Sequence, residues 1–248
     1  MKLLTRSNTK TIKGEARGFI TFILHLSPGN KSGYEVCGGR SKECFAHCLD
    51  EAGMGKFKSV QDARIRKTRW FFEDRKSFMV ALVKDISAAI RYARTRGLTL
   101  VIRLNGTSDI PWETIRCGAF KNIMERYPFL TFYDYTKLAG RKKLPSNYHL
   151  TFSASEENTL KVRQAMADGM SVAAVFDHVP ASYAGFPVIN GDEDDLRFLD
   201  PPGSVIGLKA KGPAKSHTTT FVIRSAHGTT NFNFPTHQLV GDASHARY

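Results

Sequence analysis

The chain has 248 residues, 42% of them hydrophobic, which is enough apolar content to bury one large core. No apolar run reaches the roughly 18 residues that a membrane-spanning helix needs, so we expect no membrane span. The formal net charge of +13, from 36 basic and 23 acidic residues, indicates a polyanionic partner such as nucleic acid, or an anionic substrate.

The N-terminal segment, residues 1–18, is basic but lacks the apolar stretch of a signal peptide. We therefore expect a cytoplasmic location, where the reducing environment disfavours disulfides and leaves thiols available for metal binding. The apolar run directly afterwards, residues 19–26, predicts a first strand.

Three of the four cysteines, Cys37, Cys44 and Cys48, fall within twelve residues after this strand. Thiols at that density, on a loop that leaves a strand, are more typical of a metal site than of core packing. Ser41 is placed to begin a helix, in which Cys44 and Cys48 would lie on one side because they are four residues apart. We predict a metal-binding loop over residues 37–48.

The spacing leaves the metal open between an iron–sulfur cluster and zinc. Structural zinc usually shows two C-x2-4-C pairs, and only Cys44 and Cys48 form one here, which favours the cluster. Cys117 is the predicted fourth ligand. If it is not, His25, His47 or an exogenous group would complete the site.

Helical periodicity dominates the next part of the chain. A basic helix is predicted to start at Ser59, and a longer one covers residues 75–96 and ends at Gly97. The apolar face of the longer helix comprises Phe78, Leu82, Ile86, Ala89, Ile90 and Ala93. Residues 98–104 are almost continuously apolar, which predicts a strand buried on both faces.

Strands and helices continue to alternate up to residue 176. Helices are predicted from Pro111 and over residues 156–167, and strands over residues 129–133, 149–152 and 171–176. The remainder is rich in strands, predicted at residues 186–189, 196–199, 205–209 and 221–223.

This alternation predicts an α/β fold with a parallel sheet, because parallel strands need helical crossovers. Five or six such strands and a β-rich C-terminal part predict a partial or distorted (β/α) TIM-like barrel. We expect a single barrel-like domain over residues 1–225 and an irregular tail over residues 226–248.

In such a barrel the functional residues follow the carboxyl ends of the strands. Polar side chains occur at several of these positions, which makes them candidates for binding a substrate or an anion. The candidates are Arg103, Asn105, Asp109, Lys137 and Lys209. A catalytic acid or base cannot be chosen from their positions.

Several short motifs occur along residues 15–212. They are Cys44-Phe-Ala-His-Cys48, Arg-Lys-Thr-Arg at 66–69, Arg-Leu-Asn-Gly at 103–106, Asp109-Ile-Pro-Trp-Glu113, Tyr-Asp-Tyr-Thr-Lys137, and Gly191-Asp192 ahead of residues 196–200. Together they resemble the phage and plasmid proteins of the gene product eighty-eight family. The resemblance implies a phage-encoded protein in the host cytoplasm and implies no particular reaction.

A weaker similarity is to radical S-adenosylmethionine enzymes, which carry three cysteines in the loop after the first strand of a partial barrel. Their pattern is C-x3-C-x2-C, whereas the spacing here is C-x6-C-x3-C. We therefore do not assign S-adenosylmethionine as a cofactor.

Two hypotheses of function result. In the first, Cys37, Cys44, Cys48 and Cys117 hold a [4Fe–4S] cluster at the mouth of the barrel, for redox or radical chemistry on an unidentified substrate. In the alternative, the chain binds nucleic acid through its positive charge, and a zinc ion or an iron–sulfur cluster has a structural role.

Overall fold

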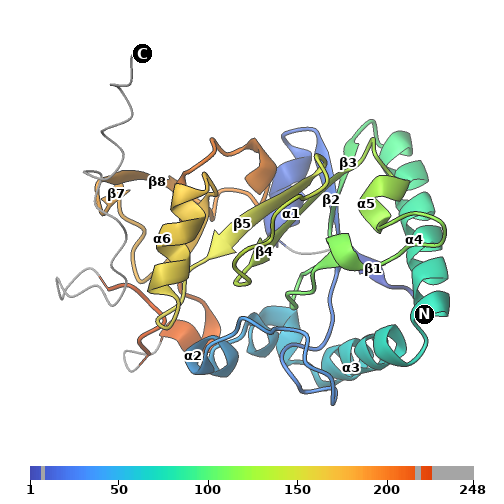
Figure 1. Cartoon of the computed structure of the whole chain (residues 1–248), viewed down its shortest axis with the longest axis horizontal. Coiled ribbons are helices and arrows are strands. Elements are labelled where there is room, and N and C mark those ends of the chain that lie inside the picture. Colours follow the sequence, from blue (N-terminus) through green and yellow to red (C-terminus); the bar gives the residue numbers. More distant parts are fainter. Residues whose placement is uncertain (7–8, 216–218, 225–248) are drawn as a thin grey trace, which may run out of the picture.

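The computed structural model describes residues 1–6, 9–215 and 219–224 (Figure 1). Within these residues the strands form one nine-stranded sheet in the order β1-β2-β3-β4-β5-β6-β9-β8-β7. The strands are β1 (Leu4–Thr5), β2 (Phe19–Leu24), β3 (Thr99–Arg103), β4 (Thr131–Thr136), β5 (Tyr148–Ser153), β6 (Val172–Phe176), β7 (Ser182–Tyr183), β8 (Phe186–Asn190) and β9 (Val205–Lys209). The predicted irregular tail, residues 226–248, lies outside the described residues.

The sheet is parallel from β2 to β8 and antiparallel only at its two edges, where β1 pairs with β2 and β7 with β8. The α/β class and the parallel sheet are therefore confirmed. In the described part of the chain β1 and β7 do not pair with each other, so the sheet is open. A TIM barrel is not confirmed.

Helices connect many of the strands. The α-helices are α1 (Thr9–Glu15), α2 (Lys42–Ala46), α3 (Lys58–Glu73), α4 (Arg75–Thr95), α5 (Ile123–Arg126) and α6 (Thr159–Ala167). The 3-10 helices are η1 (Leu49–Glu51), η2 (Gly53–Lys56), η3 (Trp112–Thr114), η4 (Arg197–Leu199) and η5 (Gly212–Lys215). Among the described helices, none is both long and apolar enough to cross a membrane.

One face of the sheet packs against α3 and α4 at one end and α6 at the other (Figure 1). The apolar stripe predicted for residues 75–96 is buried there, with Phe78, Leu82 and Ile86 fully inaccessible to solvent. Each such side chain contributes about 1.5–3 kcal/mol by leaving water. Gly97 follows α4 with a φ of 63°, which explains the end of the helix at the predicted position.

The opposite face of the sheet is covered by η4 and its flanking residues. Leu196 packs there on Val101 and Tyr133, with Phe198 against the same cluster. A strand was predicted over residues 196–199, and this prediction is wrong. The side chain of Asp194 accepts a hydrogen bond from the Leu196 amide at 2.9 Å, so the chain turns locally instead of extending.

The prediction of a helix from Pro111 is also wrong. Only η3 and the short α5 form in the connection between β3 and β4. Asn105 organises this loop: its Oδ1 accepts hydrogen bonds from the Ile110 amide and the Trp112 indole at 2.9 and 3.1 Å. A further tight turn joins Cys117 and Phe120 through two backbone hydrogen bonds. Side-chain hydrogen bonds to the backbone thus replace a regular helix.

Candidate metal centre

The cysteine loop packs directly against the carboxyl ends of β3 and β4. The Asp109 amide donates to the Val36 carbonyl at 2.7 Å, and the Lys137 amide donates to Asp109 Oδ2 at 2.7 Å. A Cβ atom on Gly39 would lie 2.8 Å from the Lys137 carbonyl carbon, so only glycine permits this approach. The loop after β2 and the ends of two neighbouring strands therefore meet at one edge of the sheet.

Cys37 lies at the centre of this contact. Its Sγ accepts a hydrogen bond from the Gly29 amide at 3.4 Å. Burial raises the pKa of Cys37 to about 12, and the nearby Cys48, Asp109 and Cys44 add to the rise. A thiol in these surroundings stays protonated at neutral pH unless a positively charged group stabilises the thiolate.

Cys44 and Cys48 are positioned by α2. Ser41 Oγ accepts a hydrogen bond from the Cys44 amide at 3.1 Å, so Ser41 begins the helix as predicted. The helix ends at Ala46, so Cys48 lies beyond it, and the prediction that Cys44 and Cys48 share one side of a helix is wrong. Burial raises the pKa of Cys48, and the negative charge that Cys44 can carry acts in the same direction.

Three thiols therefore lie within electrostatic range of one another: those of Cys37, Cys44 and Cys48. In the described residues, no group of three or more histidine, cysteine and acidic side chains is arranged to hold a metal ion. The metal assignment thus stays a prediction. The thiol-rich donor set and the amide that donates to sulfur are both compatible with an iron–sulfur cluster.

The structure does not bring Cys117 to the other thiols. Its side chain is 2% exposed and packs in the main core. Burial raises the pKa of Cys117 and Arg126 opposes this rise, whereas none of the other described cysteines contributes. Cys117 therefore lies in a separate environment.

His25 also lies apart from the thiols. Burial lowers the pKa of His25 to about 3, and the cationic side chains Arg64, Arg103 and Lys67 lower it further. Its Nδ1 is 3.5 Å from Thr5 Oγ1. The ring thus faces positive charge at the end of β2 and, among the described residues, no cysteine contributes to its pKa.

Arg103 and Asn105, two predicted ligand-binding residues, are engaged within the protein. Arg103 Nη1 is 2.5 Å from Asp195 Oδ2, across the face of the sheet that η4 covers. Asn105 uses its Oδ1 to hold the β3–β4 loop, as described above, and its Nδ2 donates to the Ile110 carbonyl at 2.9 Å. Both residues therefore have clear structural roles.

Asp109 and Lys137 do lie beside the cysteine loop. Burial raises the pKa of Asp109, and its Oδ1 is 3.6 Å from Arg141 Nη1. The Lys137 ammonium group donates to Ser153 Oγ at 2.8 Å. Lys209, the remaining candidate, is exposed at the end of β9, which β5 and β6 separate from β4.

A hollow of about 290 Å³ opens next to Cys37, between the cysteine loop, α3 and the start of the β3–β4 loop. It is lined by Glu35, Val36, Gly38, Phe71, Phe72, Arg75, Asp109, Ile110, Pro111, Ile115 and Leu138. The Arg75 guanidinium lies 3.6 Å from the centre of the Phe71 ring and forms no ion pair with any described residue. The sequence interpretation missed Arg75, because nothing local to α4 indicates which loop it faces.

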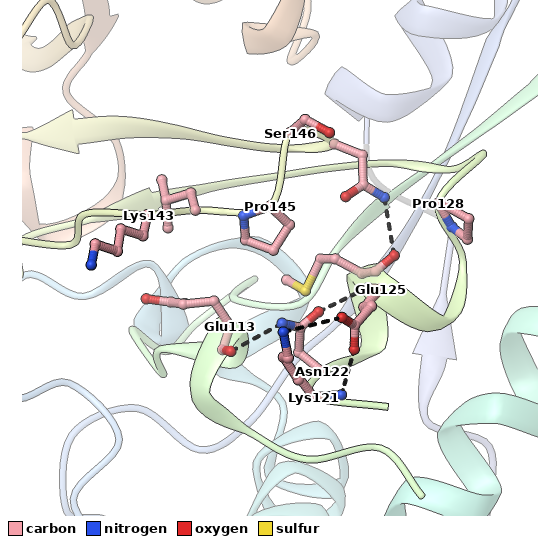
Figure 2. A pocket seen from close by; sticks show the side chains of 11 residues that line it. Glu113, Lys121, Asn122, Glu125, Pro128, Lys143, Pro145 and Ser146 are labelled. Carbon is pink, nitrogen blue, oxygen red and sulfur yellow. Dashed lines mark hydrogen bonds and ion pairs between the residues drawn. The ribbon is translucent and has the colours of Figure 1, made fainter. Parts of the chain in front are cut away.

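A second hollow, of about 490 Å³, lies near the amino ends of β4 and β5 (Figure 2). Two of its polar side chains form hydrogen bonds with the nearby backbone. Asn147 Nδ2 donates to the Met124 carbonyl at 3.2 Å, and Asn122 Oδ1 accepts a hydrogen bond from the Glu125 amide at 2.8 Å. These contacts organise the loops around it, and none of its lining residues belongs to the cysteine loop, whereas Gly38 of that loop lines the first hollow. We therefore place the candidate site at the cysteine loop.

Comparison with known proteins gives one match. The family model described as Gene product 88 matches residues 2–225. Neither the search of curated proteins nor that of solved structures found a significant match. The family comparison does not show the weaker similarity to radical S-adenosylmethionine enzymes.

Proposed function

The chain belongs to the Gene product 88 family. From the arrangement of its cysteine loop we propose that it is an iron–sulfur protein whose cluster is bound by Cys37, Cys44 and Cys48. The observation that carries the proposal is that the half-buried thiols of Cys37, Cys44 and Cys48 lie near one another, close enough for Cys44 to act on the pKa of both Cys37 and Cys48. Three thiolates held this close together repel one another, and a cationic metal centre that binds them would remove this cost. The hydrogen bond from the Gly29 amide to Cys37 Sγ supports a cluster, since such bonds tune the potential of iron–sulfur centres.

The proposed centre lies where a substrate could reach it. When bound, the cluster would supply one-electron chemistry beside the hollow next to Cys37. The aromatic and aliphatic lining would hold an apolar group, and Arg75 would bind an anionic one. Asp109 is close enough to influence Cys37 electrostatically.

The finer fold prediction, a partial TIM-like barrel, also belongs to this proposal. Two features support it: β2 to β6 are adjacent in chain order, and Asp109 and Lys137 meet beyond the carboxyl ends of two neighbouring parallel strands. In that interpretation η4 fills the concave face of an incomplete barrel.

The test is anaerobic reconstitution of the full chain with ferrous iron and sulfide, followed by metal and sulfide analysis and an absorption spectrum. We expect about four iron and four sulfide per chain, with the broad visible absorption of thiolate-ligated clusters. One zinc per chain and no colour, or no bound metal at all, would contradict the proposal.

A second candidate function, nucleic-acid binding, is favoured by the outer surface of α4, on the side of the molecule away from α6 (Figure 1). Four exposed cations lie along this helix: Lys76, Lys84, Arg91 and Arg94. The one acidic residue in α4, Asp85, accepts hydrogen bonds from the Leu3 and Leu4 amides. A helix of this length spans about 30 Å, enough to follow a phosphate backbone.

If α4 binds nucleic acid, the combined substitutions Lys84→Glu, Arg91→Glu and Arg94→Glu should weaken binding to a short DNA duplex by more than tenfold. The slope of log affinity against log salt should also become shallower by about 2–3, because each lost phosphate contact retains its counterions. Fluorescence anisotropy at several salt concentrations measures both.

The matched control carries the same change of charge at exposed lysines outside α4: Lys56→Glu, Lys142→Glu and Lys161→Glu. We expect this variant to retain most of its affinity. Equal losses in both variants, or no DNA binding by the unsubstituted protein, would argue against α4 as a nucleic-acid surface.

A further inference from the structure

Two phenylalanines in the connection between β3 and β4 are exposed to solvent: Phe129 is 71% exposed and Phe120 is 38% exposed. The Arg126 guanidinium lies 5.3 Å from the centre of the Phe120 ring and 5.9 Å from that of the Tyr127 ring. The Tyr127 and Phe129 rings follow at a centroid distance of 6.1 Å. These four side chains form one continuous aromatic surface, and exposed apolar side chains that gather in this way mark interaction sites.

The aromatic surface adjoins α4. Tyr127 Oη donates a hydrogen bond to the Val83 carbonyl at 3.2 Å and lies 3.4 Å from Ser87 Oγ. Both partners are in α4, and α5, which belongs to the same connection as the aromatic surface, lies on the α4 side of the molecule (Figure 1). Ser87 is three residues after Lys84 and four before Arg91, and residues at these spacings are neighbours on a helix. The aromatic surface is therefore next to the exposed cations of α4.

The charge around the aromatic surface favours an anionic partner. Arg116 and Lys121, in the same connection, are exposed. Of the acidic residues close to them in the chain, Glu113 binds Arg141 at 2.8 and 2.5 Å, and Glu125 accepts a hydrogen bond from the Lys121 amide at 2.6 Å. An anionic partner that also presents flat apolar faces would use both the cations and the rings. Single-stranded nucleic acid has this chemistry, because its unpaired bases leave their faces free, whereas the bases of a duplex cover one another.

We propose that the aromatic surface stacks the unpaired bases of a single-stranded nucleic acid whose phosphates bind the exposed cations of α4. This inference rests on the second candidate function and specifies the form of nucleic acid that the protein binds. Stacking on phenylalanine tolerates any base, since every base has a π face, and phosphate contacts carry no sequence information. Binding should therefore depend on strandedness and not on sequence.

The test is fluorescence anisotropy with a labelled oligothymidine of about 16 nucleotides, the upper end of single-strand site sizes, and with the duplex that it forms with oligoadenine. The single strand should bind more tightly than the duplex. An oligouridine of the same length is titrated in parallel, and the tighter of the two strands identifies DNA or RNA as the partner. Phe129→Ala should weaken single-strand binding by about fivefold or more, the loss of one stacked base, and leave duplex binding nearly unchanged. Phe129→Trp should retain the single-strand affinity, because an indole also stacks.

The matched control is Phe57→Ala. Phe57 is 48% exposed ahead of α3, outside the aromatic surface, and the Lys56 ammonium lies 5.7 Å from the centre of its ring. This variant should bind both forms of DNA like the unsubstituted protein, and circular dichroism checks that each variant folds. Duplex binding at least as tight as single-strand binding, or single-strand affinity equal in Phe129→Ala and Phe57→Ala, would overturn the inference and leave the second candidate function in place. If the unsubstituted protein binds no nucleic acid, both fail.

Discussion

Cys44→Ser is expected to abolish the bound cluster, with loss of nearly all visible absorption and of most iron and sulfide. A serine hydroxyl is almost fully protonated at neutral pH and is a poor ligand for iron, whereas the thiolate is the natural one. The substitution keeps the shape of the side chain and leaves the Cys44 amide free to bind Ser41 Oγ. We therefore expect the fold to persist, which circular dichroism would verify.

Cys117→Ser is the matched control for this experiment. Cys117 packs in the core, and its pKa is not influenced by the other described thiols, so the variant should keep the iron and sulfide content of the unsubstituted protein. The hydroxyl in an apolar pocket should lower stability by about 1–3 kcal/mol. A cluster retained in Cys44→Ser would contradict the ligand assignment, and loss of iron from a folded Cys117→Ser would restore Cys117 as a ligand.

Arg141→Ala is expected to lower the free energy of unfolding by about 3–5 kcal/mol, because it leaves buried carboxylates without their partner. The Arg141 side chain is 6% exposed and binds both oxygens of Glu113, at 2.8 and 2.5 Å. Asp109 Oδ1 lies 3.6 Å from the same guanidinium. Urea unfolding of the two proteins measures the difference.

Arg141→Lys should recover only part of this loss, since an ammonium group cannot bind both oxygens of Glu113 in the same planar geometry. The neighbouring Lys142 is exposed, so Lys142→Ala serves as the control and should change stability by less than about 0.5 kcal/mol. A loss below about 1 kcal/mol in Arg141→Ala would show that the Arg141 contacts contribute little.

The elements that the sequence predicted well are those set by local rules. The stripe from Phe78 to Ala93 repeats with the period of a helix, and Gly97 ends that helix by adopting a positive φ. Ser41 caps α2 through a side chain and an amide only three residues apart. Such contacts depend on neighbours in the chain and are therefore visible in the sequence.

The wrong predictions share a different cause. Residues 196–199 are apolar enough for a strand, but Asp194 turns the chain and Leu196 covers Tyr133 instead. The helix expected from Pro111 does not form as predicted, because the loop that Asn105 holds continues to Trp112. In both places, tertiary contacts and side-chain hydrogen bonds override the local preference for a strand or a helix.

For the candidate site, the sequence by itself determined the close spacing of Cys37, Cys44 and Cys48 and their place after the first long strand. Parallel strands then brought Asp109 and Lys137 to the same edge, as the alternating pattern predicted. Only the tertiary structure placed Cys117 in a separate environment, because its surroundings depend on how the β3–β4 loop packs. The partner of Arg103 is likewise Asp195, 92 residues along the chain, and a pairing over that distance is fixed by the fold rather than by any local pattern.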